Sequence, residues 1–173
     1  MKMKLLFVIS LIPLLFFSAN ADQTSACTLL TAKEVNGWLG AGLKAQARVG
    51  KAPMTKPGSN QVTSTVPSSN CDYASANTGL SLEVVPFTSA QIAQEQAKAR
   101  QAVMKLSMPN LKITGLNSPS AGAFFLDVTM RFPTTILGFT KKNIFVTITV
   151  FQKNKNSLEV AKSSARLIFS RLP

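Results

Sequence analysis

The first 21 residues constrain this chain most, because they predict where the rest of it folds. Lys2 and Lys4 precede an apolar run of about thirteen residues, and the small residues 18–21 follow it. A positive head, an apolar middle and an Ala-x-Ala end are typical of a secretory signal peptide. The run is shorter than the roughly 20 residues that a membrane-spanning helix needs. We therefore expect cleavage after Ala21, export to the periplasm or the medium, and no transmembrane segment in the mature chain, residues 22–173.

The mature chain has the size and the charge of one basic domain. Without its first 21 residues it falls within the usual length of a single domain. It keeps 17 basic and 7 acidic residues, a formal charge of +10. Such a charge attracts anionic partners at long range, although it also serves solubility alone. We expect an envelope protein or an anionic surface as the partner, do not expect nucleic acid, and leave the oligomeric state open.

Two cysteines, Cys27 and Cys71, remain after cleavage. Lone thiols in an exported protein meet an oxidising compartment and usually pair. We predict a disulfide between them, closing a loop of about 45 residues. A redox pair is the alternative, but the chain has no Cys-x-x-Cys and no histidine beside either thiol. No aliphatic residue stands three places before Cys27, so we do not expect a lipid anchor there.

Hydrophobic patterning predicts an α+β domain with three helices and two groups of three strands. Thr31 and Glu34 have the spacing of a capping box, and Gly40 ends the helix that they begin. Trp38, in this helix, is expected to anchor the core. Apolar residues recur every second position in the predicted strands and at helical spacing in the helices. Strands are expected at residues 43–49, 70–74, 80–85, 111–114, 124–131 and 144–151, and helices at 31–39, 88–106 and 156–172.

Two connecting segments stand out. Residues 51–69 are rich in proline, serine and threonine without an apolar period, which predicts a flexible loop. Residues 132–143, between the last two strands, carry Phe139 next to Lys141 and Lys142. This connection either folds back over the core or forms the lip of a binding groove.

Catalytic chemistry is mostly absent from the sequence. There is no histidine, which removes the commonest general base and the commonest zinc ligand. The seven carboxylates are well separated along the chain, and no phosphate-binding or calcium-binding loop occurs. We expect no catalytic residue, no metal and no cofactor. A pair of Glu83 and Asp127, each on the polar side of a predicted strand, leaves a histidine-free hydrolase as a weak alternative.

Basic residues gather in the last third of the chain, with phenylalanines between them. We take them as the candidate binding surface, with a solvated helix face as the alternative. The candidates are Phe139, Lys141, Lys142, Lys153, Lys155, Lys162 and Arg166.

The segment from Ala26 to Val35, with Cys27-Thr28-Leu29-Leu30 and Glu34-Val35, and the later Cys71-Asp72-Tyr73 resemble an uncharacterised family of small secreted bacterial domains. The resemblance covers about 50 residues. It implies a disulfide from the first helix to a strand and a curved antiparallel sheet with helices packed on it, without a known activity. Many members are lipoproteins, a property not carried over because this chain lacks the lipidation motif.

These observations together predict a two-layer α+β domain with a mostly antiparallel sheet, in the order helix, three strands, helix, three strands, helix. The leading functional hypothesis is an exported, non-enzymatic binding or accessory protein of the bacterial periplasm or cell envelope. The alternative is a secreted factor that acts on host or competitor surfaces. Neither the patterning nor the charge names a ligand.

Overall fold

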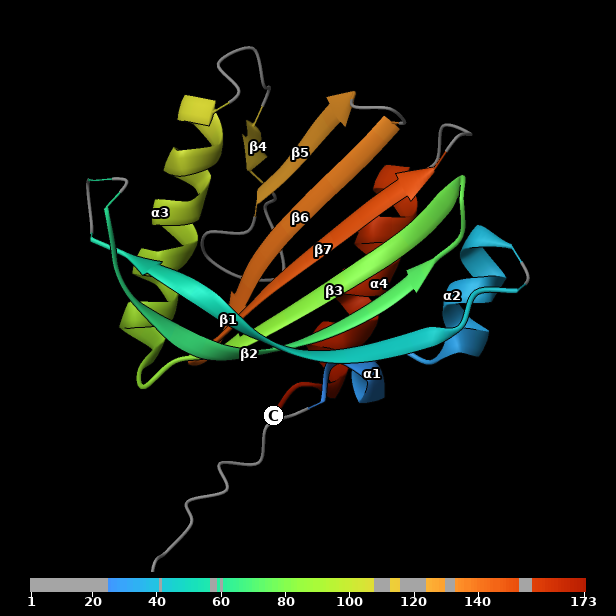
Figure 1. The fold of residues 1–173 in the computed structure, drawn as a ribbon, viewed down its shortest axis with the longest axis horizontal. Coiled ribbons are helices and arrows are strands. Elements are labelled where there is room, and N and C mark those ends of the chain that lie inside the picture. Colours follow the sequence, from blue (N-terminus) through green and yellow to red (C-terminus); the bar gives the residue numbers. More distant parts are fainter. Residues whose placement is uncertain are drawn as a thin grey trace, which may run out of the picture.

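A computed structural model describes residues 25–40, 42–56, 59, 61–107, 113–115, 124–129, 133–152 and 157–173. The predicted signal peptide, Lys153 and Lys155 lie outside these ranges. Within them the chain forms four helices and seven strands (Figure 1). In chain order they are α1 (Ala26–Leu29), α2 (Ala32–Leu39), β1 (Ala45–Thr55), β2 (Val62–Ala74), β3 (Thr78–Pro86), α3 (Ala90–Ser107), β4 (Ile113–Gly115), β5 (Phe124–Thr129), β6 (Pro133–Lys141), β7 (Ile144–Gln152) and α4 (Ser157–Arg171).

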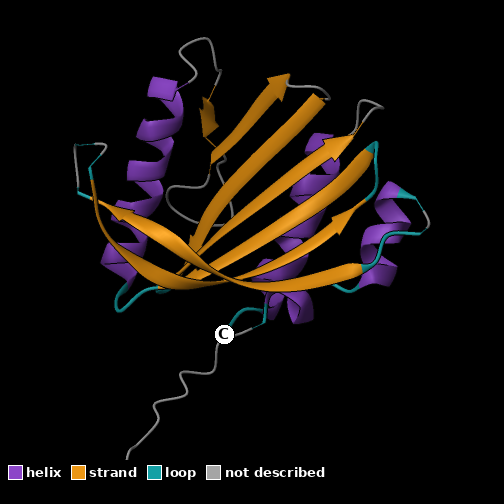
Figure 2. Ribbon diagram, viewed as in Figure 1, coloured by secondary structure: helices purple, strands orange, loops and turns teal. Residues whose placement is uncertain are grey.

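All seven strands belong to one sheet, in the order β1-β2-β3-β7-β6-β5-β4. Every neighbouring pair is antiparallel. The central strands β3 and β7 join the two halves of the chain, and β1 and β4 are the edges. Figure 2 shows how the long strands curve across the molecule. The predicted α+β class and antiparallel sheet are confirmed.

Helices lie on both faces of the sheet. One core contains side chains from α1, α2 and α4 together with Leu82, Val84 and Ile148 of the sheet. A second, smaller core contains Val85 and Phe145 together with side chains of α3. Because neighbouring residues of a strand point to opposite faces, Val84 and Val85 place α3 on the face opposite α4. The prediction of two layers was wrong, because α3 covers one end of the second face and adds a partial third layer (Figure 1).

The start of the domain follows the predicted local signals. Thr31 and Glu34 form a complete capping box on α2, in which the Thr31 side chain accepts from the Glu34 N–H and the Glu34 carboxylate accepts from the Thr31 N–H. Gly40 ends the helix with a φ of 99°, a backbone conformation that favours glycine. Trp38 is half-buried and packs against the larger core.

The predicted disulfide between Cys27 and Cys71 is present, with 5.0 Å between the two Cα atoms. It joins α1 to β2. The Tyr73 hydroxyl, two residues further along β2, donates a hydrogen bond to the Leu30 carbonyl oxygen. Two independent links therefore hold the N-terminal helices on the sheet.

The prediction of a flexible loop at residues 51–69 was wrong, because most of this segment belongs to a long hairpin of β1 and β2. β1 and β2 pair from Ala45 opposite Tyr73 to Thr55 opposite Val62. The first four residues of β2, Val62 to Thr65, are exposed. A strand that buries neither face needs no alternation of apolar residues, so the pattern that identifies strands is missing there.

The connection expected at residues 132–143 is also corrected, because most of it is strand β6. β6 turns into β7 through Lys142 and Asn143, and Lys142 has a φ of 51°. Tight hairpins usually place glycine or asparagine at such a position, so the sequence lacks the usual turn signal. The extra strand β6 and the extra helix α1 account for the difference from the predicted element order.

Most of the surface expected to be buried in α4 is buried, whereas α3 contacts the sheet partly through residues other than those expected. The sequence places Leu158, Ala161, Ala165, Ile168 and Leu172 on one stripe of α4; the last four are buried and Leu158 is partly buried. In α3 the sequence pattern places Ile92, Ala99, Val103 and Leu106 on one face. The structure instead packs Ala93 and Ala97 against the sheet, with Ile92 and Met104 beside them, and leaves Leu106 exposed. Among the described residues, no helix combines the length and apolar character that spanning a membrane requires.

Candidate binding surfaces

The two candidates at the end of β6 have structural roles. Phe139 is fully buried and its ring lies 6.0 Å from that of Phe169 in α4. The Lys141 ammonium donates to the carbonyl oxygens of Phe169 at 2.9 Å and Leu172 at 2.6 Å. A cation at the C-terminal end of a helix satisfies carbonyls that have no partner within the helix. Phe139 is therefore a core residue and not part of a binding lip, and Lys141 holds α4 on the sheet.

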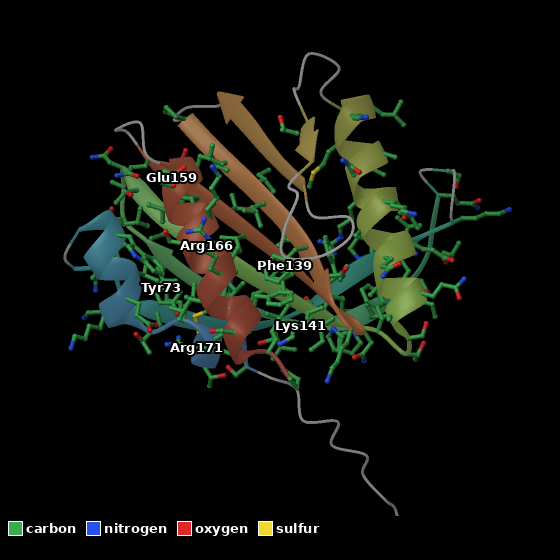
Figure 3. All side chains as sticks on the ribbon, turned by 180° about the vertical axis from the view of Figure 1, so that it is seen from behind. Tyr73, Phe139, Lys141, Glu159, Arg166 and Arg171 are labelled. Atoms are coloured by element: carbon green, nitrogen blue, oxygen red, sulfur yellow. A yellow bond between two sulfur atoms is a disulfide. The ribbon has the colours of Figure 1, made fainter. Side chains whose placement is uncertain are left out.

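The other described basic candidates remain on the surface. Lys142 is exposed in the β6–β7 turn, and Arg166 is exposed on the outer side of α4 (Figure 3). Lys162 is partly exposed and forms an ion pair with Glu159 at 3.0 Å. The structure thus retains a basic outer surface on α4 while assigning Lys141 to helix capping.

A different surface, which the sequence patterning did not single out, lies on the second face of the sheet. Six polar side chains from β2, β3 and β7 form two rows across three neighbouring strands. Adjacent strands are about 4.8 Å apart, so the members of a row are immediate neighbours. All six are partly exposed. We call this surface the polar sheet face: Asn70, Glu83 and Thr147 in one row, and Asp72, Ser81 and Thr149 in the next.

Both carboxylates of the polar sheet face are held by arginines from outside it. Arg100 of α3 donates to Glu83 at 2.5 Å and lies over the Phe145 ring, 5.2 Å from its centroid. Arg48 of the edge strand β1 pairs with Asp72. These contacts balance two negative charges with two positive ones and fix the direction of both carboxylates.

Hydroxyl groups complete the surface. The Ser81 hydroxyl donates to Asp72 Oδ1 at 2.6 Å. Thr147 Oγ1 is buried among its neighbours and makes no hydrogen bond with any described residue, which is uncommon for a buried polar atom. The face therefore offers fixed donors and acceptors rather than a net charge, and it suits recognition by hydrogen bonding.

The structure bears on two chemical possibilities, a metal site and a carboxylate pair. They contain no group of three or more carboxylate, cysteine or histidine side chains that could hold a metal ion. Glu83 and Asp127, the pair considered for hydrolysis, lie on β3 and β5, with β7 and β6 between them. Three steps of about 4.8 Å separate their backbones by roughly 14 Å, whereas glycosidase carboxylates are about 5–9.5 Å apart. The strand order gives this pair no support.

The sequence contained part of the signal for the polar sheet face. Ser81, Glu83, Thr147 and Thr149 are the polar members of two alternating strands. Patterning shows that they share a face within each strand, but not that β3 lies beside β7, more than 60 residues later. Asn70 and Asp72 lie in the strand expected at residues 70–74, but the sequence did not show that this strand lies beside β3.

The sequence matches no protein-family model and no curated protein. Among solved structures, the extracellular domain of PknH from Mycobacterium tuberculosis has a similar fold, with a TM-score of 0.57. The two sequences are 11% identical, and the match covers 84% of this chain and 93% of that domain. At this identity the similarity concerns the fold alone.

Proposed function

We propose that this protein is an exported, non-enzymatic binding or accessory domain of the bacterial periplasm or cell envelope. Its polar sheet face would contact an anionic or protein partner. The observation that carries the proposal is the composition of the central strands. β3 and β7 bury apolar side chains under α4 on one face and present Ser81, Glu83, Thr147 and Thr149 on the other.

The polar sheet face is already organised before any partner arrives. Arg100 and Arg48 hold the two carboxylates, and a regular sheet fixes the backbone under every side chain. Groups that are held in place lose less conformational entropy on binding than mobile ones. Only α3, at one end, covers this face among the described helices (Figure 1), so a partner of some size can approach it.

Two observations support export. The Cys27–Cys71 disulfide is a bond that persists in oxidising compartments and is rare in the cytosol. The fold is also similar to a domain described as extracellular. Cell fractionation tests this part: material in the periplasm agrees with the proposal, and material found only in the medium favours the alternative of a secreted factor.

The contact surface is tested by capturing partners from envelope extract with the mature, oxidised protein. Thr149→Arg adds bulk and charge on the β7 side of the polar sheet face, and Ser170→Arg adds the same group at an exposed position on α4. We expect Thr149→Arg to lose the captured partner and Ser170→Arg to keep it, with circular dichroism showing that both fold. Equal capture by both variants would contradict the assignment of this face.

The dependence of binding on ionic strength distinguishes a partner bound by the polar sheet face from one bound by the basic surface of α4. Binding through balanced, hydrogen-bonded groups changes little with ionic strength, whereas binding through exposed cations weakens steeply. A double variant, Lys162→Glu with Arg166→Glu, reverses the two charges on the outer surface of α4 and leaves Arg171 paired with Glu34. Partner capture that falls with salt and disappears in this double variant would transfer the binding function to α4.

A further inference from the structure

We propose that the free edge of β1, from Ala45 to Lys51, binds an extended acidic segment of a partner protein as an added strand. This goes beyond the proposed function, because it concerns the backbone of an edge strand and not the polar sheet face. β1 has 11 residues and only one neighbour, β2. Natural edge strands are usually short or covered, while Ala45 to Val49 are exposed on both faces.

The direction of the β1 peptide groups follows from Thr55. Its N–H donates to Gln96 Oε1, and its carbonyl oxygen accepts from Gln96 Nε2, both at 2.9 Å. Gln96 belongs to α3, so the peptide groups of Thr55 point away from β2. The register shifts between Met54 and Thr55 because β2 carries one extra residue there, Thr63. β1 itself has no extra residue, so its peptide groups keep alternating, and Pro53, two residues before Thr55, shares the direction. This agrees with its missing N–H, because proline is tolerated where an edge strand faces outward.

The same alternation defines the length of the open edge. Val49 and Lys51, and Ala45 and Ala47 before them, direct their N–H and carbonyl groups outward. Beyond them, Pro53 has no donor and Thr55 is occupied by Gln96. A partner strand of about seven residues can therefore pair with the first part of β1 and stops where the proline begins.

The charge of β1 and its flanks indicates which kind of strand binds at the open edge. Residues 44–56 contain four basic residues and no acidic one, and among the described residues Lys44 and Lys51 form no ion pair. A second copy of this chain would bring the same cations against each other, in a protein with a formal net charge of +12. An acidic segment instead gains attraction along the edge. Val49, 81% exposed, offers an apolar contact at its centre.

The test uses a synthetic peptide of alternating glutamate and valine, capped at both ends, and a matched peptide with lysine in place of glutamate. Binding is measured by titration calorimetry at low salt and by amide hydrogen exchange of the protein. We expect the acidic peptide to slow exchange at Ala47, Val49 and Lys51 by about tenfold or more. The inward amides of Arg48 and Gly50 should stay as protected as before. Binding of the basic peptide with equal affinity would overturn the proposal.

Two substitutions at one position supply the control. Val49→Pro removes an outward donor, as Pro53 already does, without removing a hydrogen bond to β2. Val49→Thr keeps the donor and the preference for strand. We expect Val49→Pro to abolish acidic-peptide binding and Val49→Thr to retain it. If Val49→Pro does not fold, Ala47→Pro provides the same comparison.

Three further results would overturn the proposal. The first is equal binding by the proline and threonine variants. The second is no binding of the acidic peptide, which would leave the basic edge as a defence against aggregation only. The third is a concentration-dependent dimer whose outward β1 amides are protected without any peptide, since it would identify a second copy as the occupant.

Discussion

Arg171, in the last turn of α4, forms a bidentate ion pair with Glu34, 137 residues earlier in the chain. Its Nη2 lies 2.5 Å from Oε1 and its Nη1 lies 3.0 Å from Oε2. The same Nη1 donates to the Leu29 carbonyl oxygen at 2.8 Å. Because Glu34 also closes the capping box of α2, one arginine joins the C-terminal helix to both N-terminal helices. Figure 3 shows Arg171 at the end of α4 beside the N-terminal helices.

This ion pair predicts a loss of stability in acid. The hydrogen bonds from Arg171, and to a lesser extent those from Thr31, lower the pKa of Glu34 from 4.5 to about 2. A lowered pKa in the folded state stabilises the protein above pH 4.5, and this stabilisation is lost as the pH falls toward 2. Since both side chains are partly exposed, we expect about 1 kcal/mol after allowance for solvent screening.

Urea unfolding of the wild type and Glu34→Gln between neutral pH and pH 2.5 measures this effect. The difference in unfolding free energy should be largest near neutrality and shrink in acid. A difference that is independent of pH would mean that the ionised carboxylate is not what Glu34 contributes.

Tyr73 predicts a second pH dependence, at the alkaline end. Burial, followed by the nearby charge of Glu34, raises the pKa of Tyr73 from 10.0 to about 12. The folded protein keeps the phenol protonated where the unfolded chain loses the proton. The stabilisation is therefore complete below pH 10 and lost as the pH rises toward 12.

The chain has a single tyrosine, so the ultraviolet absorbance of tyrosinate reports this group directly. We expect a midpoint near 12 for the native protein and near 10 in concentrated urea. Tyr73→Phe serves as the blank and loses the hydrogen bond to Leu30, at a cost of about 1 kcal/mol. A native midpoint equal to that in urea would show that the phenol is not buried in solution.

The disulfide should contribute a large share of the stability. Its cysteines are 44 residues apart, and closing a loop of this length removes unfolded-state entropy worth roughly 4 kcal/mol as an upper value. We expect a reductant to lower the free energy of unfolding by about 2–4 kcal/mol. A double variant, Cys27→Ala with Cys71→Ala, should show the lower stability and no response to reductant. Equal stability of the oxidised and reduced wild type would contradict this role.

Gly79 should tolerate no side chain. A Cβ there would lie 2.6 Å from the tip of the Phe151 ring and 2.7 Å from the Tyr73 carbonyl oxygen, which is part of the sheet backbone and cannot rotate away. At Gly50 the close atoms are the ends of the Asn70 and Ser68 side chains, which can move. We expect Gly79→Ala to lower the unfolding free energy by about 2 kcal/mol and Gly50→Ala by well under 1 kcal/mol. Equal losses of unfolding free energy in the two variants would mean that the backbone around Gly79 shifts to accommodate the Cβ atom.

Features with a local signal were predictable. The capping box of Thr31 and Glu34, the glycine end of α2, the apolar alternation of β3 and β7 and the stripe of α4 each depend on residues a few positions apart. The pairing of Cys27 with Cys71 was also predictable, because the expected compartment leaves two lone thiols one partner each.

Features without a local signal were missed. The strand expected at residues 43–49 corresponds to the first half of β1, but the continuation of β1 to Thr55 and the first half of β2 were missed. Residues 62–65 are exposed and carry no apolar period. The β6–β7 hairpin turns at Lys142, a residue that rarely takes a positive φ. For Phe139 the sequence left two alternatives, a connection folded over the core or the lip of a binding groove, because its segment was read as a connection; as part of β6 it is a core residue.

The sequence by itself determined the class of the fold, the disulfide and the apolar faces of the central strands and of α4, because hydrophobic period and helix capping act over short distances. Only the tertiary structure decided which strands are neighbours. That order places β3 beside β7 and assembles the polar sheet face, makes β1 an open edge, and brings Arg171 to Glu34. Such relationships depend on long-range pairing, whose partners no local pattern of residues specifies.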